Sequence, residues 1–516
     1  MPSPLLDQLE KWKSRFGPPG DGQLERLLAA AARRRFGDTA SLIRLHETAL
    51  FLRAYPRTPE VARLADAILF SFAERVADLP AFEEPEISGI AGTSLTAVFS
   101  WEVARRLAAR HPRNLEIGWD RYDGIDRLGP VLRRFLPLLG EDWPVEAHVP
   151  YRQWISAARP RGTTDLAWLL ERLAASPELF DTLDLPLTWR IGDTRTSRSR
   201  LRLPGREIYC HQEPLLRRSD ISLARALDGP ALPVRRLARP EARKILDLIL
   251  DTSAMRFREL YGFSHPDEGG VYRADAGRGV EIFFFGVPPA WRLPLRAYHG
   301  GMFFKNGVPA GYVEVLSLFE RAEVGFNLYY TFREGESAWL YAQLLRLFRQ
   351  VLGVSCFSVD PYQIGLENPE AVESGAFWFY RKLGFRPVDL KVAGLMEREE
   401  RRMRKTPGYR SSKRTLEKLA EGYILFEAPS CEKGVWDNFR VRNLGLAVER
   451  AHVAQSSTGL AQVLSLVPDL AHWTPQEKTA AAKILQAKET GSEARYLRLM
   501  QRHPRLRAAF LALGSR

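Results

Sequence analysis

The stretch Gly375-Ala-Phe-Trp-Phe-Tyr-Arg-Lys-Leu-Gly-Phe385 decides the fold, because it predicts one amphipathic helix that a glycine ends. Its apolar residues, together with one just before it, recur at the spacing of a single buried helix face: Val372, Ala376, Phe379, Tyr380 and Leu383. Gly384 has no Cβ and can adopt the left-handed conformation that ends a helix. Residues 387–392 then predict a strand that follows the helix directly.

The residues before this stretch predict strands and helices in alternation. Asn306-Gly307 is a preferred two-residue turn between antiparallel strands, and Gly353 ends a helix with one apolar face. The predicted elements are a strand at 234–238, a helix from Pro240, a strand at 280–285, hairpin arms at 298–304 and 310–316, a strand at 325–332, a helix at 337–352 and a strand at 354–359. This order predicts the α/β fold class, with a mixed sheet.

The order of elements and the pattern around Tyr380 resemble the GNAT superfamily of acyl-CoA-dependent N-acyltransferases. The late helix and strand of that family follow the pattern Asn-x-x-Ala-x-x-Phe-Tyr-x-Lys-Leu-Gly-Phe, and Glu373 stands at the asparagine position. The residues that match the pattern are Ala376, Phe379, Tyr380, Lys382, Leu383, Gly384 and Phe385. The resemblance covers residues 231–395 and implies a sheet that splays between the strands at 325–332 and 354–359.

The resemblance also implies an activity and its catalytic residues. A protein of this family transfers an acyl group from acetyl-CoA or another acyl-CoA to a primary amine, on a small molecule or a protein, by direct attack within a ternary complex. Tyr380 matches the position from which a tyrosine often protonates the leaving thiolate; the alternative is that its ring only packs and contacts the cofactor. Glu314 and Glu323 on the central strands are the candidate bases, and each could instead be a solvent-facing strand residue.

The resemblance places the CoA pyrophosphate at the turn before the helix 337–352, where backbone N–H groups and the helix dipole attract anions. The expected cofactor-binding residues are Tyr330, Thr331, Arg333, Gly335, Glu336, Ser337 and Ala338. Arg333 and Ala338 have the separation of the family's loop, but Gly335 lies one place early and Glu336 takes the glycine position. We expect Glu336 to point to solvent, since a carboxylate repels a pyrophosphate, and Ser337 either to cap the helix or to donate to a phosphate.

The flanking regions predict mostly helices. The expected domains are a helical domain at 1–85, a mostly helical region with a short basic β segment at 86–230, the GNAT-like domain at 231–395 and a helical extension at 396–516. Within the basic segment, alternation places Arg198, Arg200 and Arg202 on one face of a strand, which suits either a phosphate-binding strip or a charged, solvated edge strand. Thr474-Pro-Gln-Glu477 predicts a capping box at the start of a helix.

Composition narrows the cellular setting. The chain has 516 residues, a formal net charge of +13 and three cysteines at distant positions without metal-ligand spacing. No apolar run is long enough for a membrane span and no secretory signal is evident, so we expect a cytoplasmic protein with reduced thiols and without metal. The charge leaves a nucleic-acid partner open, through the basic segments 190–206 and 398–418. A further alternative is a GNAT-like module that binds a partner and catalyses nothing.

Overall fold

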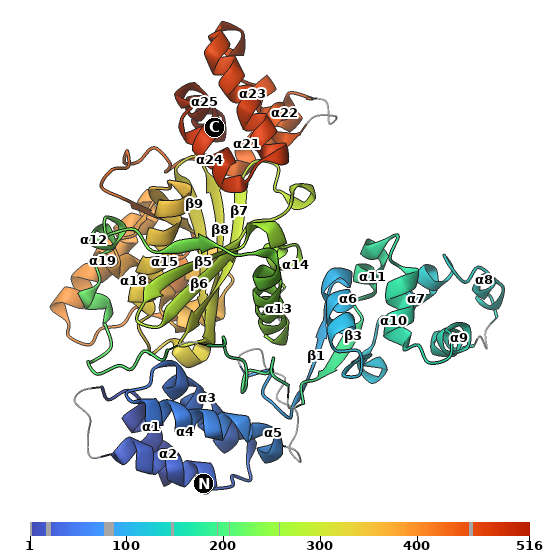
Figure 1. The fold of residues 1–516 in the computed structure, drawn as a ribbon. Helices are drawn as coiled ribbons and strands as arrows, with labels where there is room; N and C mark the ends of the chain where they lie inside the picture. Colours follow the sequence, from blue (N-terminus) through green and yellow to red (C-terminus); the bar gives the residue numbers. More distant parts are fainter. Residues whose placement is uncertain are drawn as a thin grey trace. The chain divides into compact units, whose positions relative to one another are not determined.

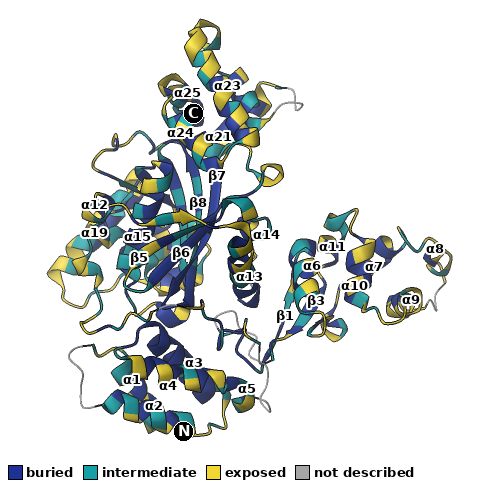
Figure 2. Cartoon of the chain, viewed as in Figure 1, coloured by how far each residue is buried: buried dark blue, intermediate teal, exposed yellow. Residues whose placement is uncertain are grey.

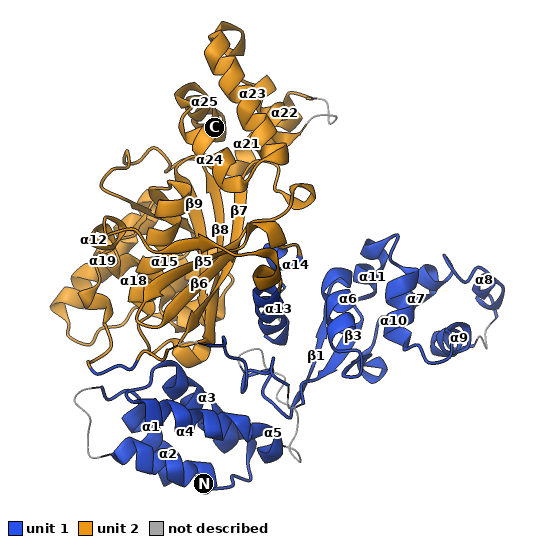
Figure 3. Ribbon diagram, viewed as in Figure 1, with its two compact units in different colours: residues 1–206, 210–212, 244–264 blue, residues 207–209, 213–243, 265–516 orange. Residues whose placement is uncertain are grey.

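The computed structural model describes residues 3–16, 22–76, 87–145, 149–192, 194–205, 207–256, 259–453 and 458–515. The chain divides into two compact units, which are coloured separately in Figure 3. Unit 1 comprises Met1–Arg206, Cys210–Gln212 and Lys244–Ser264, and unit 2 comprises Glu207–Tyr209, Glu213–Arg243 and His265–Arg516. Segments of unit 1 and unit 2 alternate along the sequence, so neither unit is one continuous segment.

Unit 1 begins with helices, as expected for residues 1–85; the stretch 77–86 lies outside the described residues. The face predicted for the second helix is confirmed, because Leu24, Leu27, Leu28 and Ala31 are buried. Asp38 and Thr58 cap the next two longer helices by accepting backbone N–H groups of Ser41 and Val61. These helices are α1 (Pro4–Lys13), α2 (Gln23–Arg33), α3 (Thr39–Ala54), α4 (Pro59–Phe70) and α5 (Phe72–Arg75).

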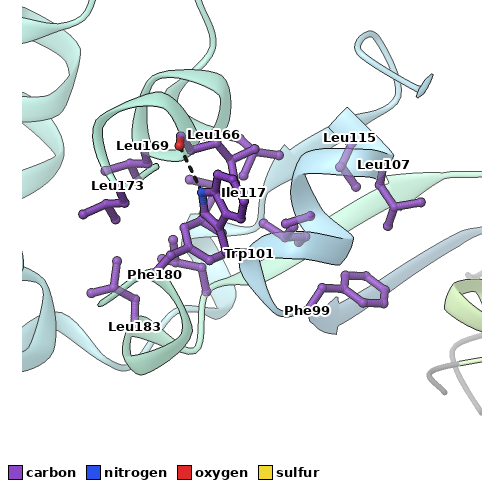
Figure 4. Packing of buried hydrophobic residues seen from close by; sticks show 14 of the residues in the cluster. Phe99, Trp101, Leu107, Leu115, Ile117, Leu166, Leu169, Leu173, Phe180 and Leu183 are labelled. Carbon is purple, nitrogen blue, oxygen red and sulfur yellow. Dashed lines mark hydrogen bonds between the residues drawn. The ribbon is translucent and has the colours of Figure 1, made fainter. Parts of the chain in front are cut away.

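The second part of unit 1 is a small antiparallel sheet with helices packed on it. Its strands lie in the order β1-β3-β2, with bounds Ser94–Val98, Pro186–Arg190 and Leu115–Ile117. Trp101 lies at the centre of its apolar core, where the indole N–H donates to the Leu170 carbonyl at 3.0 Å (Figure 4). The helices are α6 (Trp101–Arg110), α7 (Ile125–Leu132), α8 (Leu139–Asp142), α9 (Tyr151–Ala158), α10 (Asp165–Arg172) and α11 (Pro177–Leu183), followed by α13 (Arg239–Met255) from Lys244 onward and α14 (Tyr261–Ser264).

The basic β segment around Arg198 is a wrong prediction. Residues 197–200 form turns rather than a strand, and residues 207–210 form no strand either. Arg198 is buried and its guanidinium lies 3.0 Å from the Glu47 carboxylate, while Arg202 lies 2.9 Å from Asp66. Arg200 donates to the Phe70 carbonyl at 3.0 Å. These arginines hold unit 1 together through internal partners, so they do not form an exposed cationic strip.

Unit 2 is built on one mixed sheet, which bears out the α/β fold class (Figure 1). Its strand order is β11-β12-β10-β9-β8-β7-β6-β5-β4, and every neighbouring pair is antiparallel except β9 and β10, which are parallel. The central strands β6 and β7 are buried along their whole length (Figure 2). The strands are β4 (Val234–Arg236), β5 (Tyr272–Gly277), β6 (Val280–Phe285), β7 (Ala297–Lys305), β8 (Val308–Leu318), β9 (Arg321–Leu328), β10 (Cys356–Val359), β11 (Arg386–Pro387) and β12 (Ile424–Glu427).

Local signals placed several of these elements correctly. Asn306 and Gly307 both have positive φ, at 49° and 77°, as the turn between β7 and β8 requires. The predicted helix at 337–352 is confirmed as α15 (Ser337–Leu352), and Gly353 ends it in the left-handed conformation with φ 73°. The strand predicted at 325–332 begins earlier, at Arg321, because β9 leaves β8 through a tight turn at Phe319, which has φ 51°.

The helix and the strand predicted around residues 375–392 both differ from the structure. The expected single helix is broken into α17 (Pro369–Glu373) and α18 (Ala376–Lys382), because Gly375 between them has φ 68°. The strand expected at 387–392 is only the two-residue β11, because the Asp389 side chain accepts the N–H groups of Lys391 and Val392 and starts a helix there. That helix is α19 (Leu390–Lys405).

The sheet continues beyond residue 395, the expected end of the α/β domain. β12 lies between β10 and β11 and pairs with both, so residues 424–427 belong to the sheet and not to a separate helical extension. The capping box predicted at Thr474 is confirmed: Thr474 and Glu477 exchange side chain and backbone hydrogen bonds. The remaining helices are α12 (Leu223–Leu227), α16 (Pro361–Ile364), α20 (Lys413–Leu419), α21 (Val441–Arg450), α22 (Gly459–Ser465), α23 (Pro475–Thr490), α24 (Glu493–Gln501) and α25 (Pro504–Gly514).

Candidate functional site

The two parallel strands of the large sheet part at one point, and the candidate site is built around it. The last residues that β9 and β10 pair are Glu323 and Ser358. Beyond them β9 continues to Leu328 beside β8, while β10 ends at Val359 and the chain turns into α16, where the Asp360 side chain accepts the Tyr362 N–H. The pairing of β9 with β10 therefore ends directly after Glu323.

Both candidate bases lie on the same face of the sheet. Glu323 stands opposite Leu316 and Glu314 stands opposite Gly325, and directly opposed residues share a face. Glu314 accepts a hydrogen bond from the Tyr298 hydroxyl at 2.6 Å, and Arg296 lies 3.4 Å from Glu323. Both glutamates are half-buried and have polar partners, so neither is simply a solvent-facing strand residue.

Burial sets the protonation behaviour of both carboxyl groups. Desolvation raises the pKa of Glu323, and the Arg296 charge offsets part of that rise. Desolvation also raises the pKa of Glu314, against the hydrogen bond from Tyr298. A carboxylate with a raised pKa holds a proton more readily than a surface glutamate, which suits a group that accepts a proton from an ammonium ion.

A cavity of about 490 Å³ opens on this face next to Glu323. Leu316 and Leu318 of β8 give it an apolar wall, and its charged side chains come from segments far apart in the sequence. These charged side chains are Arg296, Arg321, Glu323, Asp360, Glu421, Arg440 and Arg442. Its volume is in the range of small-molecule sites. Its lining contains more arginine than the mostly apolar lining of such sites.

Two of these arginines are structural supports. Arg321 is buried and donates to the Ser358 hydroxyl at 3.3 Å and to the Phe439 carbonyl at 3.2 Å. Arg440 donates to the carbonyls of Asp437 and Phe439, both at 2.9 Å. Both guanidinium groups lie over the Tyr423 ring, at 5.6 Å and 5.1 Å from its centre. The cationic wall of the cavity is therefore held in place by the surrounding chain.

Tyr380 lies on the other face of the sheet, in a cluster of aromatic rings. Its ring centre is 5.4 Å from that of Tyr341 on α15, which in turn is 5.1 Å from that of Phe326 on β9. Burial raises the pKa of the Tyr380 phenol above its ordinary value. The phenol is therefore protonated at neutral pH, as a proton donor requires, and its raised pKa makes it a weaker acid than a surface tyrosine.

In the turn before α15, the Glu336 side chain does not lie where the sequence predicted. The Glu336 side chain does not point to solvent: it is 1% exposed and is the residue that precedes the first turn of α15. Its carboxylate accepts from Arg278 Nε and from the Leu216 N–H, both at 3.1 Å, and Lys305 Nζ lies 3.8 Å away. The charge that was expected to repel a pyrophosphate is thus neutralised inside the protein.

The other expected cofactor-binding residues surround that turn. Thr331 and Ala338 are buried, Tyr330 is exposed, and Arg333 forms an ion pair with Glu370. Gly335 donates its N–H to the Phe332 carbonyl at 2.9 Å. Ser337 is the first residue of α15 and not its cap, so that alternative is wrong. The first intrahelical hydrogen bond is donated by Leu340, which leaves the N–H groups of residues 337–339 without a partner inside the helix.

Burial also changes the pKa of Lys305, one of the cations beside Glu336. Desolvation lowers the pKa of Lys305 to about 7, although Glu336 pulls it upward. The Lys305 ammonium is 2% exposed and lies over the Tyr209 ring, 5.3 Å from its centre. Sequence reasoning did not connect Lys305 or Arg278 with this turn, because both lie more than thirty residues away from Glu336.

The structure thus groups the expected site residues in three places: the two glutamates beside the cavity, Tyr380 behind the sheet, and the turn before α15. The arginines of the cavity were missed. Arg440 and Arg442 lie outside the region of the resemblance, and Arg296 and Arg321 lie within it but at positions that no motif marks. Within the described residues, no group of three or more His, Cys, Asp and Glu side chains is arranged to hold a metal ion. Also within that part of the chain, no helix has the length and apolar character needed to cross a membrane. Comparisons with family models, curated proteins and solved structures found no match to this chain.

Proposed function

We propose that the protein is an acyl-CoA-dependent N-acyltransferase that transfers an acyl group, acetyl in the simplest case, to a primary amine. The observation that carries the proposal is the parting of the parallel strands β9 and β10 directly after Glu323, between a polar cavity on one face and the Tyr380 cluster on the other. An acyl thioester lying in that opening would be reached by an amine from the cavity side. Acyl-CoA is a co-substrate in this scheme.

The residues suggest how the protons move. The Glu323 carboxylate takes a proton from the ammonium form of the acceptor, and the free amine attacks the thioester carbonyl. The new C–N bond forms, the C–S bond breaks, and the Tyr380 hydroxyl gives its proton to the departing thiolate. Glu314, bonded to Tyr298, stands on the same face and is the alternative base.

The N–H groups at the start of α15 are the proposed contact for the CoA pyrophosphate. Glu336 no longer argues against this role, since Arg278 and Lys305 balance its charge. Arg333 is exposed at the same turn and could exchange its partner Glu370 for a phosphate.

A test begins with acetyl-CoA binding. A ligand that binds only the native state raises the unfolding temperature, so acetyl-CoA or CoA should stabilise the protein in a concentration-dependent way. Release of the free thiol, followed with a thiol reagent, should then depend on an added amine. The thiol release should rise with pH as Glu323 loses its proton.

The second candidate is a module that no longer binds CoA and acts by binding a partner. The turn before α15 favours it: the charge of Glu336 is balanced, but a side chain stands where the family pattern has glycine. Absence of stabilisation by acetyl-CoA and by CoA, together with absence of amine-dependent thiol release, would establish that candidate over the enzyme.

A further inference from the structure

We infer that the acceptor amine also carries an anionic group, a carboxylate or a phosphate, which the arginines of the cavity beside Glu323 bind. The inference rests on the proposed function, because it names the class of acceptor for that same site. It adds a recognition element that neither the resemblance nor the reaction requires, since acyl transfer needs only a free amine.

The first support is the charge of the cavity. Four arginines, namely Arg296, Arg321, Arg440 and Arg442, face three carboxylates there. Arg296 lies 3.4 Å from Glu323, so this pair cancels one charge of each sign. The remaining arginines, Arg321, Arg440 and Arg442, outnumber the remaining carboxylates, Asp360 and Glu421. An excess of positive charge in a cavity attracts an anion.

The second support is the state of the individual arginines. Arg321 and Arg440 are held by carbonyl groups of the chain, which cannot neutralise their charges. Arg442 is exposed, and within the described residues its guanidinium makes no hydrogen bond or ion pair. It stands in the first turn of α21, where the helix dipole adds to the positive potential. Guanidinium groups bind carboxylate and phosphate oxygens in pairs, so these arginines suit either anion.

The third support is the position of the proton acceptor. Glu323 lines the same cavity as the arginines and also stands at the point where β9 and β10 part. A small molecule bound by its anionic group to the arginine wall therefore has its ammonium group within the cavity that Glu323 lines. A volume of about 490 Å³ accommodates a molecule of amino-acid size or somewhat larger.

The test compares primary amines of similar size whose second group is apolar, a carboxylate or a phosphate. With acetyl-CoA present, thiol release is measured for butylamine, 4-aminobutanoate and O-phosphoethanolamine. We expect kcat/KM to be at least about tenfold higher for one or both anionic amines than for butylamine. Preference for 4-aminobutanoate identifies the carboxylate as the recognised group, and preference for O-phosphoethanolamine identifies the phosphate. Equal turnover of butylamine would overturn the inference and leave the acyltransferase intact.

The variant that tests the arginine wall is Arg442→Glu, with Arg450→Glu as the matched control on the same helix. Both residues are exposed, so the same charge reversal is made twice, and only Arg442 lines the cavity. Arg442→Glu should lower kcat/KM for the preferred anionic amine by roughly tenfold more than it lowers that for butylamine. Arg450→Glu should change neither. An unchanged preference in Arg442→Glu would contradict the assignment.

Calorimetry separates the inference from the proposed function. The heat of binding of 4-aminobutanoate and of O-phosphoethanolamine is measured without acetyl-CoA and again with CoA. One outcome is that the anionic amines bind, that Arg442→Glu weakens this binding, and that the protein transfers no acyl group. This outcome would support the anion site and reject the proposed enzyme. Absence of binding by both anionic amines in both conditions would reject the anion site, whatever the turnover of butylamine.

Discussion

At the scale of single residues, Glu336 shows how a position that departs from a family pattern acquires a different role. Its carboxylate is buried, contacts Arg278 and Lys305 and accepts the Leu216 N–H, so it joins the start of α15 to three other segments of unit 2. The charge is therefore part of the internal structure of the unit and not a free charge at the anion site.

This role predicts a large cost for removing the charge. Glu336→Gln should lower the free energy of unfolding by about 3 kcal/mol, because the buried Lys305 and the half-buried Arg278 would both lose their counter-ion. Urea denaturation measures the change, and Glu373→Gln is the control, since Glu373 is exposed at the end of α17. If the two variants proved equally stable, the carboxylate would have to lie in solvent as the sequence suggested.

The hydroxyls of Tyr380 and Tyr341 make a matched pair for testing the proton donor. Tyr380→Phe should lower turnover by roughly 10²–10⁴-fold with little change in stability, since the ring contacts remain. The Tyr341 hydroxyl is buried and has no hydrogen-bond partner in the described part of the chain, so Tyr341→Phe should raise the free energy of unfolding by about 1 kcal/mol. Turnover of the Tyr341 variant should stay near that of the parent.

Unchanged turnover in Tyr380→Phe, with chemistry as the slow step, would leave Tyr380 as a packing residue and make water the acid. Stability measurements on both variants exclude the trivial explanation that a loss of turnover reflects unfolding.

His299 predicts a pH-dependent part of the stability. Burial lowers its pKa to about 4, and the nearby Lys488 charge acts in the same direction. The unfolded state binds a proton near pH 6.5 and the native state does not, so stability is fully present above pH 6.5 and falls as the pH drops toward 4. Between pH 7.5 and pH 5 this group should cost about 2 kcal/mol.

The check is urea denaturation at both pH values in the parent and in His299→Leu, where that part of the pH dependence should vanish. Other groups, including the Lys488–Glu493 pair next to it, titrate in both proteins and cancel in the difference. His472→Leu, at an exposed position, should keep the parent's pH dependence. Identical slopes in the parent and His299→Leu would mean that His299 is not buried in its neutral form.

At the scale of secondary structure, the break between α17 and α18 can be tested by the sign of a change in the free energy of unfolding. Gly375 has φ 68°, and a Cβ at this position would meet no atom within 4 Å, so strain is the main cost of a side chain there. Gly375→Ala should lower the free energy of unfolding by about 1 kcal/mol, and Gly375→Asn by less, because asparagine tolerates this conformation. In a continuous helix, Gly375→Ala would instead stabilise by about 1 kcal/mol. Urea denaturation distinguishes the two signs.

The elements that the sequence predicted well are those whose signals are local. The turn at Asn306-Gly307, the helix α15 and its end at Gly353 each follow from residues that are neighbours in the chain. The strand expected at 387–392 was wrong because Val388, Leu390 and Val392 alternate like a strand, whereas one hydrogen-bonding side chain, Asp389, starts a helix. The position of β12 between β10 and β11 joins distant segments, and nothing local indicated it.

The candidate site also contains residues that local sequence signals indicated and residues that they did not. The sequence indicates only that Glu314 and Glu323 lie on strands, and their shared face follows from the register of β8 and β9. Arg440 and Arg442 reach the cavity only through the folding of the chain beyond β12. The burial of Glu336 depends on Arg278 and Lys305, which no periodic pattern connects with it.

At the scale of the whole molecule, the compact units do not follow the boundary expected at residue 230. Unit 1 includes Lys244–Ser264, the later part of α13 together with α14, although those residues come after the start of the large sheet. Asp251 of this segment is fully buried and lies 2.9 Å from Arg110 and 3.3 Å from His111. Ala254 and Met255 belong to the apolar core of unit 1.

A fragment cut at the expected boundary should therefore be less stable than one that includes this segment. Residues 1–230 leave Arg110 without Asp251 and also without Asp247, whose carboxylate lies 2.7 Å away, and they lack part of the core around Met255. We expect the fragment 1–230 to unfold roughly 10 °C below the fragment 1–264, the effect of losing one partner of a buried ion pair in a domain of this size. The fragment 1–243 is the control: it is longer than 1–230 but adds only residues assigned to unit 2, so it should behave like the shorter one. Thermal unfolding followed by circular dichroism ranks the three fragments, and equal midpoints for 1–230 and 1–264 would show that unit 1 ends before α13.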